Sequence, residues 1–260
     1  MSNKTRKILW KLFIYLLMAV IVAVCLFPVL WSCIISIKSV GEKVSGFNAL
    51  SVGTPTMANY ERLFELLPIW QHLGNSVFTS VVGTLTTLFF CALAGFAFAK
   101  FKFPGRNALF YFVVATMTIP AEVGAVPLFL IMKNMELINS LWSLILPRLA
   151  TAVGVFYLRQ YIMEVPDEII EAARIDGCND VRVFFQVILP LSKPMLAAVS
   201  LFIAVGFWND YYSYMMYIAT KPTLQPFAWV LRRVLKRCRD MGFDTFNIGP
   251  ELEFFLFETD

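Results

Sequence analysis

The chain has 260 residues, of which 58% are hydrophobic and only 15% are charged, with a net charge of +4 and a mean hydropathy of +0.69. An average soluble domain has roughly 45–50% apolar and about 25% charged residues. The composition therefore excludes an ordinary soluble domain and predicts an integral membrane protein.

Five runs of the sequence are long and apolar enough to cross a bilayer, which takes about 20 mostly apolar residues. These runs are residues 12–37, 75–99, 108–131, 140–160 and 195–219. The sequence thus predicts an all-α polytopic membrane protein with five transmembrane helices.

Basic residues mark one side of these predicted spans. Four precede the first run, namely Lys4, Arg6, Lys7 and Lys11. Because positive charge is typical of cytoplasmic loops, we expect a cytoplasmic N-terminus, and Lys100, Lys102 and Arg106 then also fall inside. A cleaved signal peptide is the alternative for the first run. Its apolar stretch is too long for an ordinary signal core, so we expect a retained anchor.

The third run is interrupted by two prolines and a glutamate. Pro120 and Glu122 stand within it and Pro127 follows, which predicts a broken or bent helix whose exposed backbone lines a cavity. An ionisable group at membrane depth is costly unless it faces protein or water. Glu122 is therefore a candidate cavity residue, and the alternative is an acid that faces headgroups near the outer boundary.

The fourth run contains Pro147 and Arg148. The Arg148 guanidinium would either hydrogen-bond a hydroxyl-rich ligand or extend to the outer membrane interface along its apolar stem. We favour the second interpretation.

A polar segment, residues 166–190, separates the fourth and fifth runs. Pro166 cannot continue a preceding helix, Asp167 is a good N-cap, and Gly177 suits the left-handed position after a helix, so these residues predict a helix of about nine residues. Asn179 offers a second cap, and Pro190 and Pro194 are expected to end the second helix. The segment is therefore predicted to be a helix, a glycine corner and a second helix on the cytoplasmic side.

This segment resembles the signature of the permease subunits of ABC importers, which reads Glu-Ala-Ala, three residues, Gly, nine residues, an aliphatic residue, any residue, and Leu-Pro. The matching residues are Glu171, Ala172, Ala173, Gly177, Val187, Leu189 and Pro190. Asp176, in Arg-Ile-Asp-Gly, and the later Phe-Trp-Asn-Asp of residues 207–210 resemble the carbohydrate branch of that family. The resemblance covers about residues 1–234.

The resemblance implies that the chain forms half of a pore with a second permease subunit in the bacterial cytoplasmic membrane. Cytoplasmic ATP-binding subunits would bind ATP and Mg²⁺, and an extracytoplasmic solute-binding protein would deliver a sugar or oligosaccharide. The 171–177 helix would transmit closure of the ATPase as a rigid-body push. The chain itself would be no enzyme, since it has no phosphate-binding Gly-x-x-x-x-Gly-Lys-Ser/Thr motif, and would bind no cofactor and no nucleic acid, only membrane lipid and these partners. A different solute is the alternative.

Aromatic and hydrogen-bonding side chains gather within the fifth run. Trp208, Asn209, Asp210 and Tyr211 offer aromatic faces, an amide and a carboxylate, the groups that bind sugars, and are a possible substrate path. The alternative is an aromatic belt at the interface, with Asn209 in helix packing.

Residues 235–260 depart from the permease pattern, which usually has a sixth helix. They resemble the start of the glutamine synthetase catalytic domain, where a basic helix leads to a strand reading Gly-Pro-Glu-x-Glu-Phe-Phe-Leu-Phe. Glu251 and Glu253 match metal-binding glutamates of that family. So short a fragment builds no active site, so we expect no ligase activity and no functional metal site. We divide the chain into a permease domain, 1–234, and a fragment, 235–260; a truncated, non-functional chimera is the alternative.

Overall fold

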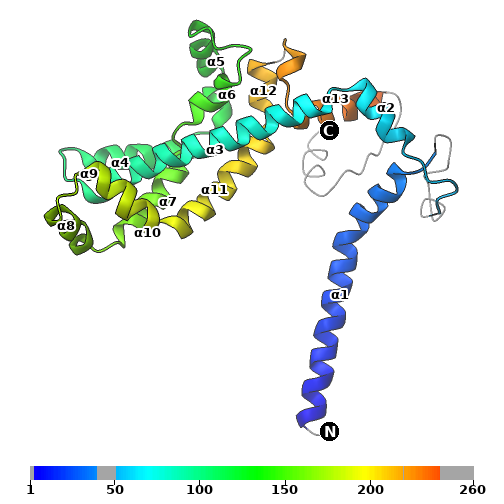
Figure 1. Cartoon of the computed structure of the whole chain (residues 1–260), viewed down its shortest axis with the longest axis horizontal. Helices are drawn as coiled ribbons and strands as arrows, with labels where there is room; N and C mark the ends of the chain where they lie inside the picture. Colours follow the sequence, from blue (N-terminus) through cyan, green and yellow to red (C-terminus); the bar gives the residue numbers. More distant parts are fainter. Residues whose placement is uncertain (1–2, 40–50, 219, 241–260) are drawn as a thin grey trace. The chain divides into compact units, whose positions relative to one another are not determined.

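The computed structural model describes residues 3–39, 51–218 and 220–240, and the regular elements within them are all helices (Figure 1). The chain divides into two compact units. One consists of Met1–Pro68 with Leu235–Asp260, and the other of Ile69–Val234. The predicted strand with Glu251 and Glu253 lies outside the described residues.

The first unit contains two described helices, α1 (Asn3–Ser36) and α2 (Ala58–Leu66). Trp10–Ser36 of α1 is apolar enough to cross a membrane, and its side chains are largely exposed, as a lipid-facing helix requires. The Asn59 amide donates to the backbone oxygens of Ser36, at 3.0 Å, and Lys38, at 2.7 Å. These bonds hold the start of α2 against the end of α1.

The second unit is built around one long helix, α3 (Ile69–Lys100), along which α7 (Ala152–Met163) and α11 (Lys193–Trp208) pack (Figure 1). The other helices are shorter. They are α4 (Arg106–Ala115), η2 (Thr116–Thr118), η3 (Ala121–Gly124), α5 (Ala125–Asn134), α6 (Trp142–Ile145), η4 (Leu146–Arg148), α8 (Asp167–Ile175), α9 (Asp180–Val183), η5 (Phe184–Ile188), α10 (Leu189–Leu191), α12 (Tyr212–Tyr217), η6 (Pro222–Leu224) and α13 (Phe227–Asp240).

An apolar core lies where α3, α7, α8 and the segment 180–188 meet. Its buried side chains are Cys91, Ala92, Phe96, Val155, Leu158, Ile162, Val165, Ile170, Val183, Phe184 and Ile188. Ile170 is the buried residue of α8. In water, burial of such a side chain is worth about 1.5–3 kcal/mol, so Ile170 fixes α8 to the end of the helix bundle.

The predicted break in the third run is confirmed. Helix α4 ends at Ala115, Ile119 is extended with φ −90° and ψ 117°, and α5 begins only at Ala125. A residue before proline is driven out of the helical region, which explains the extended Ile119 in front of Pro120.

The expectation of five spanning helices needs revision, because three of the five runs are broken. Two helices, at Trp10–Ser36 and Ile69–Lys100, are long and apolar enough to span among the described residues; a bent pair, Asp180–Leu191 with Lys193–Trp208, makes a third if it counts as one span. The fourth run is divided into α6, η4, which contains Pro147, and α7, which begins only at Ala152. The exact number of crossings stays a prediction.

The second helix of the 166–190 segment ends at Leu191, one residue past Pro190 and before Pro194, close to the predicted end. Phe184–Ile188 forms a π-helix, in which the Leu189 backbone N–H donates to the Phe184 oxygen, and the helix continues to Leu191. A proline ring clashes with the carbonyl four residues before it, and the wider π-turn relieves that clash. The chain bends by 80° only after Leu191.

Glycine makes the contact between α3 and α11 possible. A Cβ on Gly83 would lie 2.6 Å from the ring of Phe207, which is buried. We expect Gly83→Ala to lower the free energy of unfolding by about 1–3 kcal/mol, because the ring has to move. Thermal unfolding in detergent measures this.

Gly74→Ala is the matched control on the same helix, since no atom lies within 4 Å of its added Cβ. Alanine there should stabilise α3 by up to about 1 kcal/mol. Equal effects of the two substitutions would contradict close packing at Gly83.

Candidate functional site

Helix α8 occupies the predicted first helix of the 166–190 segment with the expected length. Asp167 is its first residue, and Pro166 takes the cap position, so the expected Asp167 cap is wrong. Gly177 has φ +85°, the left-handed conformation expected of it. The Gly177 N–H donates to the Arg174 oxygen at 3.0 Å, and the Cys178 N–H to the Ala173 oxygen at 2.9 Å. This pair of bonds is the Schellman motif, which closes the helix tightly.

The residues of the permease-like signature are mostly accessible. Glu171, Ala172, Asp176 and Gly177 are exposed, and so is Pro190, whereas Ala173 and Leu189 are half-buried. Because Ala172 carries only a methyl group, the exposed side of α8 lets another protein approach its backbone closely.

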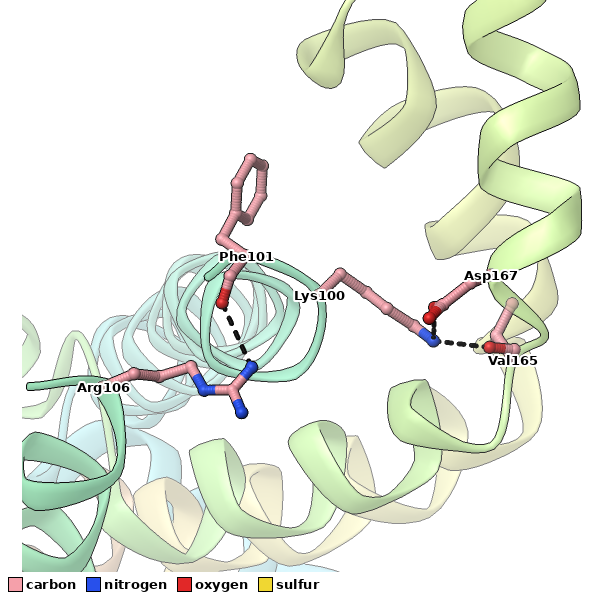
Figure 2. A network of polar contacts seen from close by, with 5 residues as sticks. All are labelled: Lys100, Phe101, Arg106, Val165 and Asp167. Carbon is pink, nitrogen blue, oxygen red and sulfur yellow. Dashed lines mark hydrogen bonds and ion pairs between the residues drawn. The ribbon is translucent and has the colours of Figure 1, made fainter. Parts of the chain in front are cut away.

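An ion pair fastens the start of α8 to the end of α3 (Figure 2). The Lys100 ammonium donates to the Asp167 carboxylate at 2.6 Å and to the Val165 backbone oxygen at 2.5 Å. The Lys100 side chain is 8% exposed, and that of Asp167 is 75% exposed. The hydrogen bond from Lys100 and its positive charge hold the pKa of the Asp167 carboxyl below its usual value. The Asp167 carboxyl is therefore ionised at neutral pH.

The corner after α8 is held by polar bonds to the next helix. The Arg174 guanidinium contacts the Asp180 carboxylate at 2.8 Å, and both groups are half-exposed. The Asn179 side chain accepts from the Arg182 N–H at 2.9 Å, which confirms the predicted cap. The ion pair thus joins α8 to α9 across Gly177, and the Asn179 cap fixes the start of α9.

A second polar group lies where α6, α11 and α12 meet α3. The Asp210 carboxylate is 6% exposed and contacts the Arg148 guanidinium at 2.8 Å. It also accepts from the Ser213 N–H at 3.0 Å. The Arg148 guanidinium lies 5.4 Å from the centre of the Phe207 ring. Arg148 therefore has a carboxylate partner that its sequence neighbours did not reveal, and the placement of its guanidinium at the outer membrane interface stays a prediction.

Sequence reasoning missed the polar face of α3 that supports this pair. The Thr87 hydroxyl donates to the Arg148 backbone oxygen at 2.7 Å, and the hydroxyls of Thr79 and Tyr214 share a 2.5 Å hydrogen bond. The sequence signal is a series of small and hydroxyl residues at helical spacing. They are Ser76, Thr79, Ser80, Gly83, Thr84 and Thr87, all buried.

The other predicted path residues are dispersed. Trp208 and Asn209, which end α11, are exposed, and the Arg232 guanidinium lies 3.7 Å from the centre of the half-buried Tyr211 ring. The backbone of Glu122 lies in η3, and its side chain is outside the described part of the structure. Asp210 is therefore the candidate whose surroundings are most fully defined.

Metal binding finds no support in the described residues. Within 3–39, 51–218 and 220–240, no group of three or more His, Cys, Asp or Glu side chains is placed to hold a metal ion.

Comparison with known proteins gives consistent matches. The family model of the binding-protein-dependent transport system inner membrane component matches residues 91–230. The polygalacturonan/rhamnogalacturonan transport system permease protein YtcP of Bacillus subtilis (strain 168) is 32% identical over 93% of this chain and 83% of its own length. The arabinooligosaccharides transport system permease protein AraQ of Halalkalibacterium halodurans is 35% identical over 81% of this chain and 76% of its own.

Two further matches extend the comparison. The sn-glycerol-3-phosphate transport system permease protein UgpE of Escherichia coli O1:K1 / APEC is 33% identical over 73% of this chain and 70% of its own. A crystal structure of a bacterial ABC transporter involved in the import of the acidic polysaccharide alginate superposes with a TM-score of 0.80 at 24% identity, over 98% of this chain and 87% of that chain. This structural likeness concerns the fold.

The ion pair between Arg148 and Asp210 is testable by a double-mutant cycle. Arg148→Gln should lower the free energy of unfolding by about 3 kcal/mol, because it leaves the Asp210 charge buried without its partner. Adding Asp210→Asn should restore part of that loss. Denaturation in detergent measures all three variants against the parent.

The control cycle uses the exposed pair, Arg174→Gln with Asp180→Asn, for which the coupling should be at most about 1 kcal/mol. A coupling at Arg148 and Asp210 no larger than this control value would contradict a buried pair.

Proposed function

Since the chain belongs to the family of binding-protein-dependent transport system inner membrane components, we propose that this permease subunit imports an oligosaccharide derived from a polysaccharide. The observation that supports this substrate class is the naming of relatives that the chain matches over more than two thirds of their length. YtcP is named for polygalacturonan and rhamnogalacturonan, and AraQ for arabinooligosaccharides. A smaller solute is the alternative substrate, because UgpE is named for sn-glycerol-3-phosphate.

The proposed assembly is that of an ABC importer. A second permease subunit completes the pore, two cytoplasmic ATP-binding subunits hold ATP and Mg²⁺, and an extracytoplasmic solute-binding protein delivers the solute. The N-terminus lies in the cytoplasm in this arrangement, together with Lys100, Lys102 and Arg106, as the distribution of basic residues predicts. ATP hydrolysis then belongs to the partners, and this chain supplies a passage and the means to open it.

We assign the contact with the ATP-binding subunit to α8. Three features support the assignment: its outer side is exposed, Gly177 closes its end tightly, and Ile170 anchors it in the core. The ion pair between Lys100 and Asp167 joins its first residue to the last residue of α3. A push on α8 therefore passes to the central helix of the unit without bending a loop, as a rigid-body movement.

The proposed substrate path runs past the end of α11. Asp210 is held by Arg148, Trp208 and Asn209 are exposed beside it, and Tyr211 adds an aromatic face; Glu122 belongs to the same proposal on sequence grounds alone. Aromatic faces and fixed hydrogen-bonding groups together suit a sugar ring with its hydroxyls. The Asp210 carboxylate is partly neutralised by its partner, which leaves the path without a strong net charge at this point.

The division of the chain at residue 234 and the glutamine synthetase relationship of residues 235–260 stay proposals. Helix α13 runs from Phe227 to Asp240 and so continues across the proposed junction. Sequencing of single DNA molecules across codons 200–260 tests this division. Reads that contain both segments show that the two belong to one gene.

If α8 couples ATP hydrolysis to transport, uptake should depend on which residue replaces Gly177. Gly177→Pro should abolish uptake by the assembled importer while ATP hydrolysis persists, because proline requires φ near −65° and has no N–H for the Arg174 oxygen. Labelled-solute uptake into vesicles and phosphate release are measured together.

Gly177→Asn is the matched variant, since asparagine tolerates the left-handed conformation. It should keep uptake within about threefold of the parent. Unchanged uptake and unchanged stimulation of the ATPase in the proline variant would remove the coupling role.

The substrate path predicts that Trp208→Ala lowers oligosaccharide uptake about threefold to tenfold, through loss of one aromatic face. Phe202→Ala is the control, because Phe202 is an exposed aromatic residue of the same helix outside the proposed path. Vesicles containing the assembled importer are assayed with labelled oligosaccharides and with glycerol 3-phosphate. Uptake of glycerol 3-phosphate alone would overturn the substrate class, and equal loss in both variants would overturn the path.

A further inference from the structure

A cavity of about 410 Å³ lies between α4 and α7, and none of its lining residues belongs to the two ion pairs of Lys100 and Arg148 described above. Arg106 and Asn107, in the first turn of α4, contribute to its wall. Arg159 and Gln160, near the end of α7, contribute from the opposite side. Two guanidinium groups and two amides thus converge on one space, which is an unusual concentration of hydrogen-bond donors beside an apolar helix bundle.

Neither arginine has a carboxylate partner among the residues that the structure describes. The ion pairs there are those of Lys100, Arg148 and Arg174, and the described side chains that line the cavity include no Asp or Glu. Two half-buried cations in one cavity repel each other unless an anion joins them. The cavity therefore has the charge of an anion site.

Backbone bonds fix both guanidinium groups without using all their donors. Arg106 donates through Nη1 to the Phe101 oxygen at 3.2 Å (Figure 2) and through Nε to the Asn107 side-chain oxygen at 3.4 Å, and Arg159 donates through Nε to the Phe98 oxygen at 3.4 Å. The Arg159 guanidinium also lies 3.9 Å from the centre of the Phe110 ring. Because a guanidinium has five N–H donors, several remain on each arginine for a ligand with several oxygens.

The start of α4 adds to the positive field. Gly105 precedes it in the left-handed conformation, with φ 80°, and gives it no side-chain cap, and the first turn has no acidic residue. The positive end of the helix dipole is therefore not compensated by the chain itself. It acts on the same space as the two arginines.

The cavity is amphipathic along the helices. Its polar residues lie near Lys100, where α3 ends and α8 begins. Phe110 and Val114 of α4 and Phe156 of α7 line the part of the cavity farther from that end. The rings of Phe110 and Phe156 stack at 6.3 Å, which makes this inner wall firm and apolar. A ligand that fits has an anionic head and a hydrocarbon part directly behind it.

We propose that this cavity binds the phosphate of an anionic phospholipid, with Arg106 and Arg159 on the phosphate oxygens and the start of an acyl chain against Val114 and Phe156. In the orientation given above, the polar end faces the cytoplasmic leaflet, where anionic headgroups meet basic residues of membrane proteins. The lipid relieves the repulsion between the two arginines and fastens α4 to α7 beside the α3–α8 junction. The site is independent of the solute that is transported.

The test uses the assembled importer in detergent, titrated with phosphatidylglycerol, with phosphatidylcholine or with inorganic phosphate, and analysed by native mass spectrometry. Saturable binding of phosphatidylglycerol, at least about tenfold tighter than that of phosphatidylcholine, is expected. Arg106→Gln and Arg159→Gln should each weaken it about fivefold to tenfold. Equal binding of the two lipids would overturn the proposal.

Two further variants separate loss of the site from loss of the fold. Asn107→Asp keeps the size of the side chain, adds a carboxylate to the cavity and should also weaken phosphatidylglycerol binding, while the thermal stability of the lipid-free complex should not fall, because the new charge lies beside Arg106 and at the start of α4. Lys102→Gln removes an exposed positive charge at the same end of the bundle and should leave binding unchanged. If Lys102→Gln weakens binding as much as the arginine variants, or if inorganic phosphate displaces the lipid at equal concentration, a lipid site in this cavity is excluded.

Discussion

The fold depends on how closely α3 approaches α7 and α11. Helices in a bilayer gain little from hydrophobic burial against one another, so they associate through close contact and hydrogen bonds, and small residues allow both. A side chain on Gly83 would meet the Phe207 ring, one on Gly95 the backbone of Arg159, and one on Gly154 the Cys91 sulfur. The polar face of α3, the buried ion pair and the apolar core under α8 all exist because these three positions keep the helices in contact.

The same contact explains why one end of the unit is stiff. Arg159 follows Leu158, which packs at Gly95, and α7 ends at Met163, a few residues before α8 starts. Lys100 is the last residue of α3, and its ammonium forms an ion pair with Asp167, the first residue of α8. Force applied to α8 therefore reaches two packed helices at once, and the short connection leaves little room for a hinge.

Local signals in the sequence predicted local structure well. The length of α8, the left-handed Gly177, the Asn179 cap and the break before Pro120 each follow from residues within one turn of the feature. One exception is Asp167, which begins α8 while Pro166 takes the cap position. Another is the π-turn before Pro190, which no residue pattern predicted.

Longer-range pairings were out of reach of such signals. Arg148 and Asp210 lie on different elements, and each was weighed alone, so the arginine was assigned to the membrane surface. The hydroxyl face of α3 was overlooked for a related reason, because serine and threonine lower the hydropathy of a span only slightly and the run was scored as a whole. A helix that keeps its polar residues on one face, next to glycine, indicates a packed surface even when its average composition is that of a lipid-facing helix.

The π-turn at Phe184–Ile188 sets the phase of the helical turn that follows it, Leu189–Leu191. An α-helix advances about 100° per residue, and a π-turn holds one residue more between bonded groups than an α-turn does. The extra residue thus fixes which sides of this turn Leu189 and Pro190 occupy, so that Leu189 is half-buried and Pro190 is exposed. A deletion of one residue within Phe184–Ile188 would rotate this turn by about 100° and change which of its side chains face the core and which face solvent.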